Sequence, residues 1–332
     1  MRTFSHPGYK RFLLSVGCLL SIHFTALFFL TLFRLVFFFS ANYDFPDQEH
    51  VGFMSIWPAF IRGVWFDNVI ACYILLIPLV AVSISALFNY YGKILWNVTC
   101  IFFSLFYGIV LLVTAANIPY FQYFFKIINS SVFNWFGYMN TTAGMVFGET
   151  SYYPPLIGFL LTLVLFIWLM RRLIRHFQRL LNTKNPSVFW LDRIYIFLTA
   201  GICIGLCLFG IRGRTGYNPI KVSAAYYCTD PFLNQLGISP VFNLLSSTLD
   251  DSRKENRYLH LMPENEALEN TRHYLNRPGI EGISPIARQI NASDSLRRPN
   301  IVLIFMESMS AHLMKRFGQQ KELTPFLDSL YR

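Results

Sequence analysis

The chain has 332 residues, of which 54% are hydrophobic and only 14% are charged. Soluble globular proteins carry about 25% charged residues, so this composition points to a lipid environment. The net charge of +10 does not indicate nucleic-acid binding, because the basic residues flank apolar runs and form no patch on a polar surface. Five of the six cysteines lie inside apolar runs and Cys228 has no nearby partner, so neither a disulfide framework nor a cysteine zinc site is expected.

Five apolar runs have about the length of 17–25 residues that a transmembrane helix needs. They cover residues 12–39, 69–87, 94–118, 154–170 and 190–211. The first run exceeds the roughly 7–15 apolar residues of a secretory signal, and no cleavage site follows it, so we interpret it as an uncleaved anchor. The sequence therefore predicts an α-helical polytopic membrane domain over residues 1–211.

The lysines and arginines beside these runs predict the orientation, because positive residues concentrate in cytoplasmic loops. The opposite loops, at residues 40–68 and 119–153, contain only Arg62 and Lys126. The segments on the N-terminal side contain nine basic residues, namely Arg2, Lys10, Arg11, Lys93, Arg171, Arg172, Arg175, Arg179 and Lys184. We therefore expect a multi-pass protein of the cell membrane (inner or plasma membrane), with a cytoplasmic N-terminus and an extracytoplasmic part after Ile211.

The outer loop at residues 119–155 is crowded with aromatic side chains, which favour the headgroup level of a bilayer. Either this loop admits a lipid substrate from the outer leaflet or it is an interfacial anchor. Trp135 is the candidate substrate contact in the loop. Arg212 and Arg214, where the last run ends, are candidates for contact with an anionic headgroup, and a plain interfacial anchor is the alternative.

Two ionisable residues fall inside the first apolar run. His23 is expected to make a polar contact between helices or to be an unpaired neutral ring. Arg34 lies near the outer end of the run, so we expect its long side chain to snorkel outward to the interface.

Residues 212–298 have an ordinary soluble composition, are interrupted by prolines and predict an extracytoplasmic connector. Within it, residues 264–275 predict one helix, with acidic residues early and Arg272 and His273 late. The apolar run at residues 301–306 predicts a strand buried on both faces of an α/β sheet. Glu307 follows at once. Its carboxylate would bind a hard metal ion at the strand end or would cap the following turn.

Residues 299–308 read Pro-Asn-Ile-Val-Leu-Ile-Phe-Met-Glu-Ser, and residues 323–330 read Leu-Thr-Pro-Phe-Leu-Asp-Ser-Leu. Together they resemble the opening of the catalytic domain in the lipoteichoic-acid-synthase-like branch of the sulfatase and alkaline phosphatase superfamily. The order of five spans, connector and α/β domain is also similar to that branch. The resemblance implies that residues 299–332 are the N-terminal fragment of such a catalytic domain.

The same resemblance implies that Glu307 is a ligand of a divalent metal, commonly Mn²⁺. It also implies a threonine nucleophile a few tens of residues further on, so no catalytic residue is expected within this chain and the 332 residues are expected to be catalytically silent. The implied reaction moves a phosphoglycerol-like group from an anionic membrane phospholipid to an acceptor. A phosphoethanolamine transferase, a sulfatase-like hydrolase and a non-catalytic membrane module stay open as alternatives.

Overall fold

The computed structural model describes residues 6–41, 53–181, 190–253, 261–276, 287, 300, 302–307 and 309–330. The chain divides into two compact units, Met1–Leu259 and His260–Arg332. Helices dominate both units, and the described residues contain no β-strand. Arg2 and Lys184, counted for the orientation, and most of residues 277–299 lie outside the described part of the chain.

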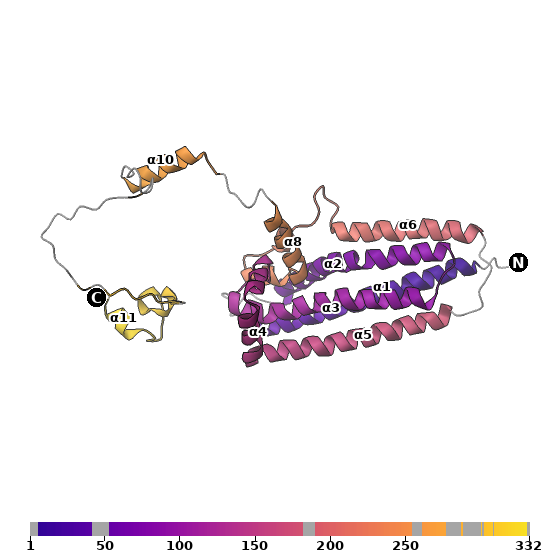
Figure 1. Cartoon of the computed structure of the whole chain (residues 1–332), viewed down its shortest axis with the longest axis horizontal. Coiled ribbons are helices and arrows are strands. Elements are labelled where there is room, and N and C mark those ends of the chain that lie inside the picture. The colour runs from indigo at the N-terminus through magenta and orange to yellow at the C-terminus, as the bar shows by residue number, and fades with distance from the viewer. Residues whose placement is uncertain are drawn as a thin grey trace. The chain divides into compact units, whose positions relative to one another are not determined.

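Five long apolar helices run side by side in the first unit (Figure 1). They are α1 (Pro7–Ser40), α2 (Phe53–Leu87), α3 (Lys93–Phe124), α5 (Tyr153–Leu181) and α6 (Trp190–Arg212). Each is long and apolar enough to cross a bilayer, which requires about 20 residues. The five predicted spans are thereby confirmed as helices, and the chain is a multi-pass membrane protein.

The largest differences from the predicted spans are at the start of α2 and the end of α5. Helix α2 begins at Phe53, whereas the apolar run begins at residue 69. Arg62 and Asp67 interrupt the hydropathy, but Asp67 pairs with Arg34 inside the bundle and Arg62 donates to the Ala224 carbonyl of the connector. Helix α5 continues to Leu181 because its basic last turns keep helical geometry beyond the apolar run that ends at residue 170. Much of the predicted loop at residues 40–68, and the first part of the segment that follows residue 170, is therefore helix.

Helix α2 lies at the centre of the bundle. Its most apolar window is 61% buried, against 11% for α5 and 17% for α6. It packs against α1 and α6, and α3 packs against α5 and α1. The outer faces of the bundle expose large apolar side chains such as Phe24, Phe28, Val164 and Leu206, as lipid contact requires.

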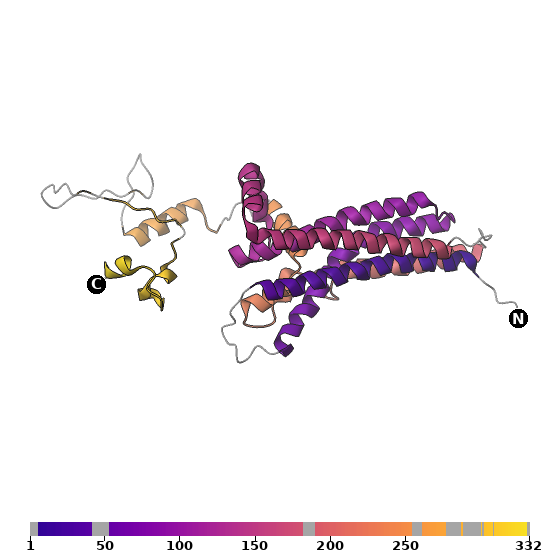
Figure 2. The same ribbon diagram turned by 90° about the horizontal axis from the view of Figure 1, so that it is seen from below.

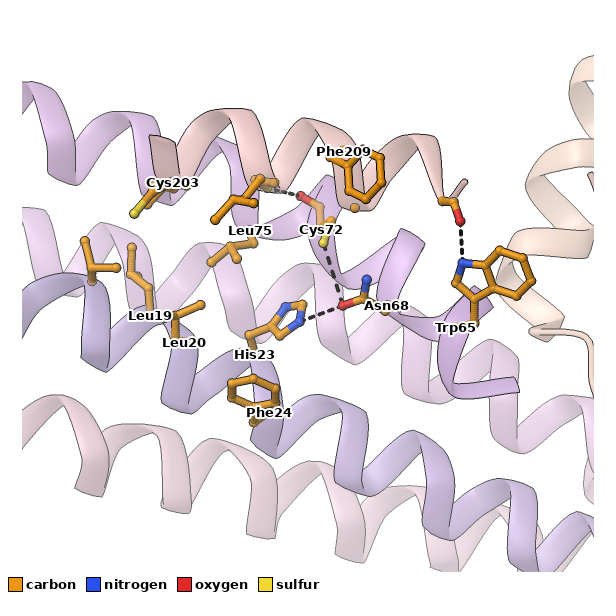
Figure 3. Close-up of a pocket in the computed structure, with 16 residues that line it drawn as sticks. Leu19, Leu20, His23, Phe24, Trp65, Asn68, Cys72, Leu75, Cys203 and Phe209 are labelled. Carbon is orange, nitrogen blue, oxygen red and sulfur yellow. Dashed lines mark hydrogen bonds between the residues drawn. The ribbon is translucent and has the colours of Figure 1, made fainter. Parts of the chain in front are cut away.

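A polar contact joins α1 to α2 in the middle of the bundle and lines a cavity of about 400 Å³ (Figure 3). His23 Nε2 donates to Asn68 Oδ1 over 3.0 Å, and the thiol of Cys72 lies 3.8 Å from the same oxygen. On the α6 side, the thiol of Cys207 donates to the Cys72 carbonyl over 3.3 Å. The expected interhelical role of His23 is confirmed.

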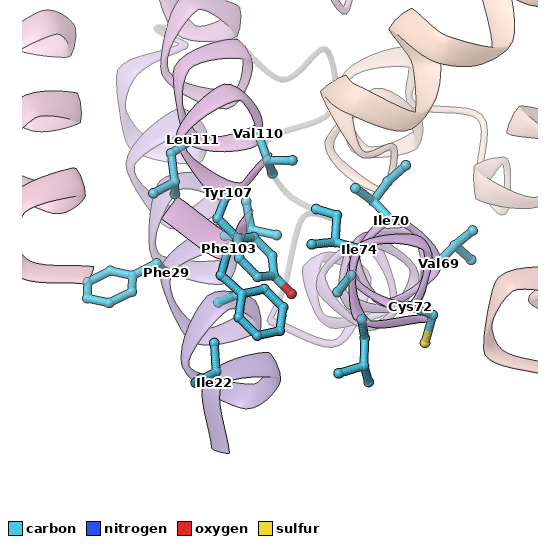
Figure 4. Close-up of a cluster of buried hydrophobic side chains, with 14 of the residues drawn as sticks. Ile22, Phe29, Val69, Ile70, Cys72, Ile74, Phe103, Tyr107, Val110 and Leu111 are labelled. Carbon is cyan, nitrogen blue, oxygen red and sulfur yellow. The ribbon is translucent and has the colours of Figure 1, made fainter. Parts of the chain in front are cut away.

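Apolar packing fills the space between α1, α2 and α3, where Phe103 and Tyr107 of α3 point toward α2 (Figure 4). The ring centroid of Phe166 from α5 lies 6.1 Å from that of Phe29 and 5.3 Å from that of Tyr107, and both pairs pack edge to face. Such aromatic pairs add about 0.5–1.5 kcal/mol beyond area burial. These contacts hold α5, which otherwise faces outward, onto the bundle.

Shorter helices gather at one end of the bundle, which we call the connector end. They are η1 (Ser130–Tyr138, a 3-10 helix), α4 (Met139–Gly148), α7 (Pro231–Leu236) and α8 (Pro240–Ser252). Helix α4 lies across the bundle axis in both views (Figures 1 and 2). The opposite end, where α1 begins and α5 ends, is called the N-terminal end.

The second unit contains α10 (Glu264–Leu275), which confirms the predicted helix, and the short α11 (Pro325–Ser329). The predicted strand is not formed: residues 302–306 have no regular structure, and Phe305 is 90% exposed. Ile301, the first residue of that strand, lies outside the described residues. A strand buried on both faces needs neighbouring strands and covering layers, and the described residues supply neither.

Candidate functional site

A cavity of about 510 Å³ opens at the connector end of the first unit. Helix α3 forms one wall, η1 and α4 form the roof, and the first turns of α5 close the other side. Its volume falls within the range of roughly 300–1,000 Å³ that is typical of small-molecule sites. The residues that line it include Ala116, Tyr120, Phe124, Trp135, Thr142 and Phe159.

Three aromatic rings build one wall of this cavity. Tyr120 lies 4.7 Å from Phe124 and 5.8 Å from Trp135, and Phe124 lies 5.8 Å from Trp135, all between ring centroids. The aromatic cluster joins the last turns of α3 to η1. The candidate substrate contact Trp135 therefore lies in a built cavity and not on a detached loop.

Hydrogen bonds hold η1 over the cavity. Asn129 caps η1, because its side-chain oxygen accepts from the backbone N–H of Ser131 over 3.2 Å. The Tyr120 hydroxyl lies 3.3 Å from the Ser131 hydroxyl, and Thr142 of α4 donates to the Trp135 carbonyl over 3.3 Å. These side-chain contacts thus fix η1 to α3 and to α4.

The chemistry of the lining selects for an apolar ligand. No charged side chain is among the described residues that form the walls. A phosphate buried there would lose its hydration without a compensating partner, which costs several kcal/mol or more. At the rim, the ammonium of Lys126 lies 5.9 Å from the Phe124 ring centroid. The arrangement suits a lipid whose chains enter the cavity while its headgroup stays outside, near Lys126.

Lys126 also lines a second, polar cavity of about 400 Å³ between the α3–η1 loop and the connector. Gln235 of α7 joins the connector to the α3–η1 loop. Its side-chain oxygen accepts from the Ile127 N–H over 3.1 Å, and its amide donates to the Phe125 carbonyl over 3.3 Å. The apolar and the polar cavity therefore share the segment that follows α3.

An ion pair buried between α1 and α2 corrects the prediction for Arg34. The side chain does not snorkel, since Arg34 is only 5% exposed and donates to Asp67 Oδ2 over 2.6 Å. It also donates to the carbonyls of Leu236 and Ile238 at the C-terminal end of α7. The carbonyls at a helix end lack helical partners, so they are free to accept hydrogen bonds from the guanidinium. With the Asp67 carboxylate, they satisfy the guanidinium inside the protein, and the side chain does not need to reach the interface.

A second contact from α2 holds the connector. The guanidinium of Arg62 lies 4.5 Å from the Tyr227 ring centroid, and its Nε donates to the Ala224 carbonyl over 3.3 Å. The Tyr227 hydroxyl donates to the Ser55 carbonyl. Burial is the main cause that raises the pKa of Tyr227, so its hydroxyl stays a neutral donor at physiological pH.

Arg212 and Arg214 organise their own loop. Arg212 donates to the carbonyls of Gly216 and Tyr217, and Arg214 donates to the carbonyl of Asn218. These bonds fold the chain back directly after α6. Both side chains are exposed or half-buried, and a headgroup contact for them stays a prediction.

Glu307, the predicted metal ligand, is exposed in the second unit. Among the described residues, no three His, Cys, Asp or Glu side chains gather where they could hold a metal ion. A hard cation takes about six oxygen ligands, so one exposed carboxylate does not fit Mn²⁺ by itself. In the same unit Thr324 donates to Asp328 Oδ2 over 3.2 Å, which makes Thr324 part of the turn before α11.

The residues that sequence reasoning missed are Asp67 and Asn68, the partners of Arg34 and His23. A signal for them existed, because two adjacent polar residues directly precede an apolar run and have to bury their side chains if the helix starts earlier.

No family model matches this sequence, and the comparisons with curated proteins and with solved structures find no match either.

Proposed function

We propose that this chain is the membrane part of a phosphotransferase that takes a phospholipid from the outer leaflet. The observation that carries the proposal is the aromatic cavity at the connector end, which has no charged side chain among its described walls. Such a cavity receives acyl chains and leaves the phosphate at the rim. The connector follows at that same end of the bundle, so a catalytic domain attached to it would meet the headgroup there.

The reaction class comes from the sequence resemblance. The transferred group is phosphoglycerol-like, the donor is an anionic phospholipid, and Glu307 contributes to a divalent metal site that the remainder of a sulfatase-like α/β domain completes. The resemblance implies that the nucleophile is a threonine. A phosphoethanolamine transferase or a sulfatase-like hydrolase would use the same lipid-facing cavity and differ in the group it transfers. The N-terminal end is cytoplasmic in this proposal.

One observation favours a non-catalytic membrane module instead. Residues 302–307 are exposed and irregular, and Glu307 belongs to no group of three or more His, Cys, Asp or Glu side chains among the described residues. In that case the bundle would still bind lipid, whereas no extension of the chain would restore turnover.

Photocrosslinking tests the lipid site directly. We would reconstitute the chain with phosphatidylglycerol carrying a diazirine on one acyl chain and map the labelled peptides by mass spectrometry. Crosslinks are expected in α3, α4 and the start of α5. Ala116→Phe fills the cavity and should reduce them about tenfold, a loss that corresponds to roughly 1.4 kcal/mol of binding.

The matched control is Ile109→Phe, which adds a ring two turns earlier on the same face of α3 and leaves the cavity open. Equal labelling of wild type and Ala116→Phe would refute a specific lipid cavity. Quenching of Trp135 by brominated lipid, with Trp135→Phe as the reference, gives an independent readout of lipid contact.

The reaction is tested by phosphoglycerol release from phosphatidylglycerol with Mn²⁺. A fusion that supplies the remainder of a sulfatase-like domain after Arg332 is expected to turn over, its Glu307→Ala variant to lose activity by several orders of magnitude, and the 332-residue chain to be silent. Turnover by the Glu307→Ala variant at the wild-type rate would refute the ligand assignment.

A further inference from the structure

A basic cavity lies at the N-terminal end of the bundle, opposite the apolar cavity at the connector end. Its volume is about 520 Å³. Three segments that are distant in the sequence meet around it, namely the start of α1, the turn between α2 and α3, and the end of α5.

Four cationic side chains line this cavity, and no carboxylate is among its described lining residues. They are Arg11, Lys93, Arg175 and Arg179. Four like charges around one cavity repel each other, and an anion at their centre would reverse the sign of that interaction. The charge pattern therefore selects for an anionic ligand, in contrast to the cavity at the connector end.

Arg11 is the fixed part of the cavity. It is only 8% exposed, and its Nε and a terminal nitrogen donate to the Leu181 carbonyl over 3.2 and 2.7 Å. Its guanidinium lies 5.5 Å from the Tyr91 ring centroid. The last residue of α5 and the α2–α3 turn thereby hold a buried positive charge in place.

Two buried polar atoms at this cavity have no hydrogen-bond partner in the described part of the chain, the Tyr91 hydroxyl and the Asn89 side-chain oxygen. Burial raises the pKa of Tyr91 to about 12, so the hydroxyl stays protonated and can donate a hydrogen bond. Buried polar atoms are nearly always satisfied in proteins, which makes an unpaired donor beside four cations a sign of a missing acceptor.

One acidic residue, Asp192, acts electrostatically on Tyr91 but does not line the cavity. Asp192 of α6 is wholly buried, lies 2.8 Å from His6 Nδ1, and accepts the Gly8 N–H over 3.3 Å. Its oxygens are thus engaged at the first turn of α1, and Asp192 is not among the residues that line the cavity.

We propose that this cavity binds the phosphate of an anionic phospholipid in the leaflet at the N-terminal end. The helices end at this level, where lipid phosphates lie, and basic pockets between transmembrane helices are known to take anionic headgroups. A phosphate ester offers several strong acceptors, which match the arginines, Lys93 and the Tyr91 hydroxyl. The inference is independent of the proposed phosphotransferase function.

Native mass spectrometry of the delipidated 332-residue chain in non-ionic detergent tests this proposal, because the micelle removes the general attraction of a charged membrane surface. Dioleoyl phosphatidylglycerol is expected to bind one site at least about tenfold more tightly than dioleoyl phosphatidylcholine. The double variant Lys93→Gln with Arg179→Gln should weaken phosphatidylglycerol binding at least about tenfold, since each basic residue near an anionic lipid contributes roughly a fivefold effect.

The matched control is Arg171→Gln with Arg172→Gln, which removes the same charge from α5 outside the cavity. It should change the affinity less than about threefold, and an equal loss in both double variants would overturn the proposal. Competition with inorganic phosphate and glycerol 1-phosphate distinguishes the ligand sources. Displacement of the lipid only at millimolar concentrations supports a lipid site, whereas tight binding of free phosphate with no preference for phosphatidylglycerol would overturn it.

Discussion

At the residue scale, the bundle depends on charges buried inside it. Arg34 and Asp67 form an ion pair in which both side chains are almost fully buried. Desolvating two charges is costly, and the cost is offset here by the short ion pair and by the two connector carbonyls that accept from Arg34. Arg34 thereby joins α1, α2 and α7, so the connector and the membrane helices share one polar centre.

Removing one member of this pair should destabilise the protein. Arg34→Gln or Asp67→Leu leaves an uncompensated polar or charged group in the bundle and is expected to cost about 3–5 kcal/mol of stability. Arg34→Met with Asp67→Leu removes both charges and should recover a large part of that loss. Thermal unfolding in detergent measures all three variants. A double variant as unstable as both single changes together would show that the pair is not energetically coupled.

Gly63 on α2 makes room for the Arg34 guanidinium. A Cβ at this position would lie 2.1 Å from Arg34 Cζ, far inside van der Waals contact. Gly63→Ala should therefore displace Arg34 and lower the unfolding temperature of the wild type. In the background of Arg34→Met with Asp67→Leu, the same change should have a much smaller effect, because methionine is flexible. An equal loss in both backgrounds would assign the role of Gly63 to helix packing elsewhere.

At the element scale, the described part of the connector in the first unit, residues 212–253, is a folded layer. Asn234 of α7 organises it. Its side-chain oxygen accepts from the Tyr227 and Cys228 N–H groups over 2.9 and 3.3 Å, and its amide donates to the Cys228 carbonyl over 2.7 Å. One side chain thus satisfies three backbone groups that no helix pairs, which fixes the turn before α7 against the end of the bundle.

Asn234→Leu should loosen this layer locally. Three backbone groups lose their partner, and each buried unsatisfied group costs about 1–3 kcal/mol. Hydrogen exchange is expected to accelerate in residues 226–236 while the membrane helices keep their protection. Asn270→Leu, an exposed change on α10, is the control and should leave the exchange of residues 226–236 unaltered. Unchanged exchange in Asn234→Leu would contradict the assigned role.

At the scale of the whole molecule, the distribution of charge predicts one orientation in the membrane. Arg175 and Arg179 on α5 and Lys93 at the start of α3 lie at the N-terminal end, whereas Lys126 and Arg62 are nearer the connector end. Reporter fusions should place the N-terminus and residues 182–189 in the cytoplasm and Ser246 outside it. A cytoplasmic signal from a fusion after Ser246 would contradict the five-span topology.

The sequence by itself determined the five spans and the helix at residues 264–275. Both are local properties: a bilayer selects about 20 consecutive apolar residues, and helix α10 follows from charges placed within a few turns. Hydropathy cannot report which helix a polar residue meets. Hydropathy alone therefore places Arg34 at the interface and the start of α2 too late in the sequence.

Only the tertiary structure decided the pairings and the cavities. Arg34 meets Asp67 and the end of α7, Trp135 meets Tyr120, and Arg11 meets Leu181 because helices distant in sequence pack side by side. The run at residues 301–306 shows the converse: its composition favours a buried strand, yet its described residues 302–306 are irregular, because a strand takes its hydrogen bonds from a neighbour and not from its own residues. Helices satisfy their own backbone groups within one segment, which is why the spans could be predicted from the sequence, whereas the irregular state of residues 302–306 and the cavities could not.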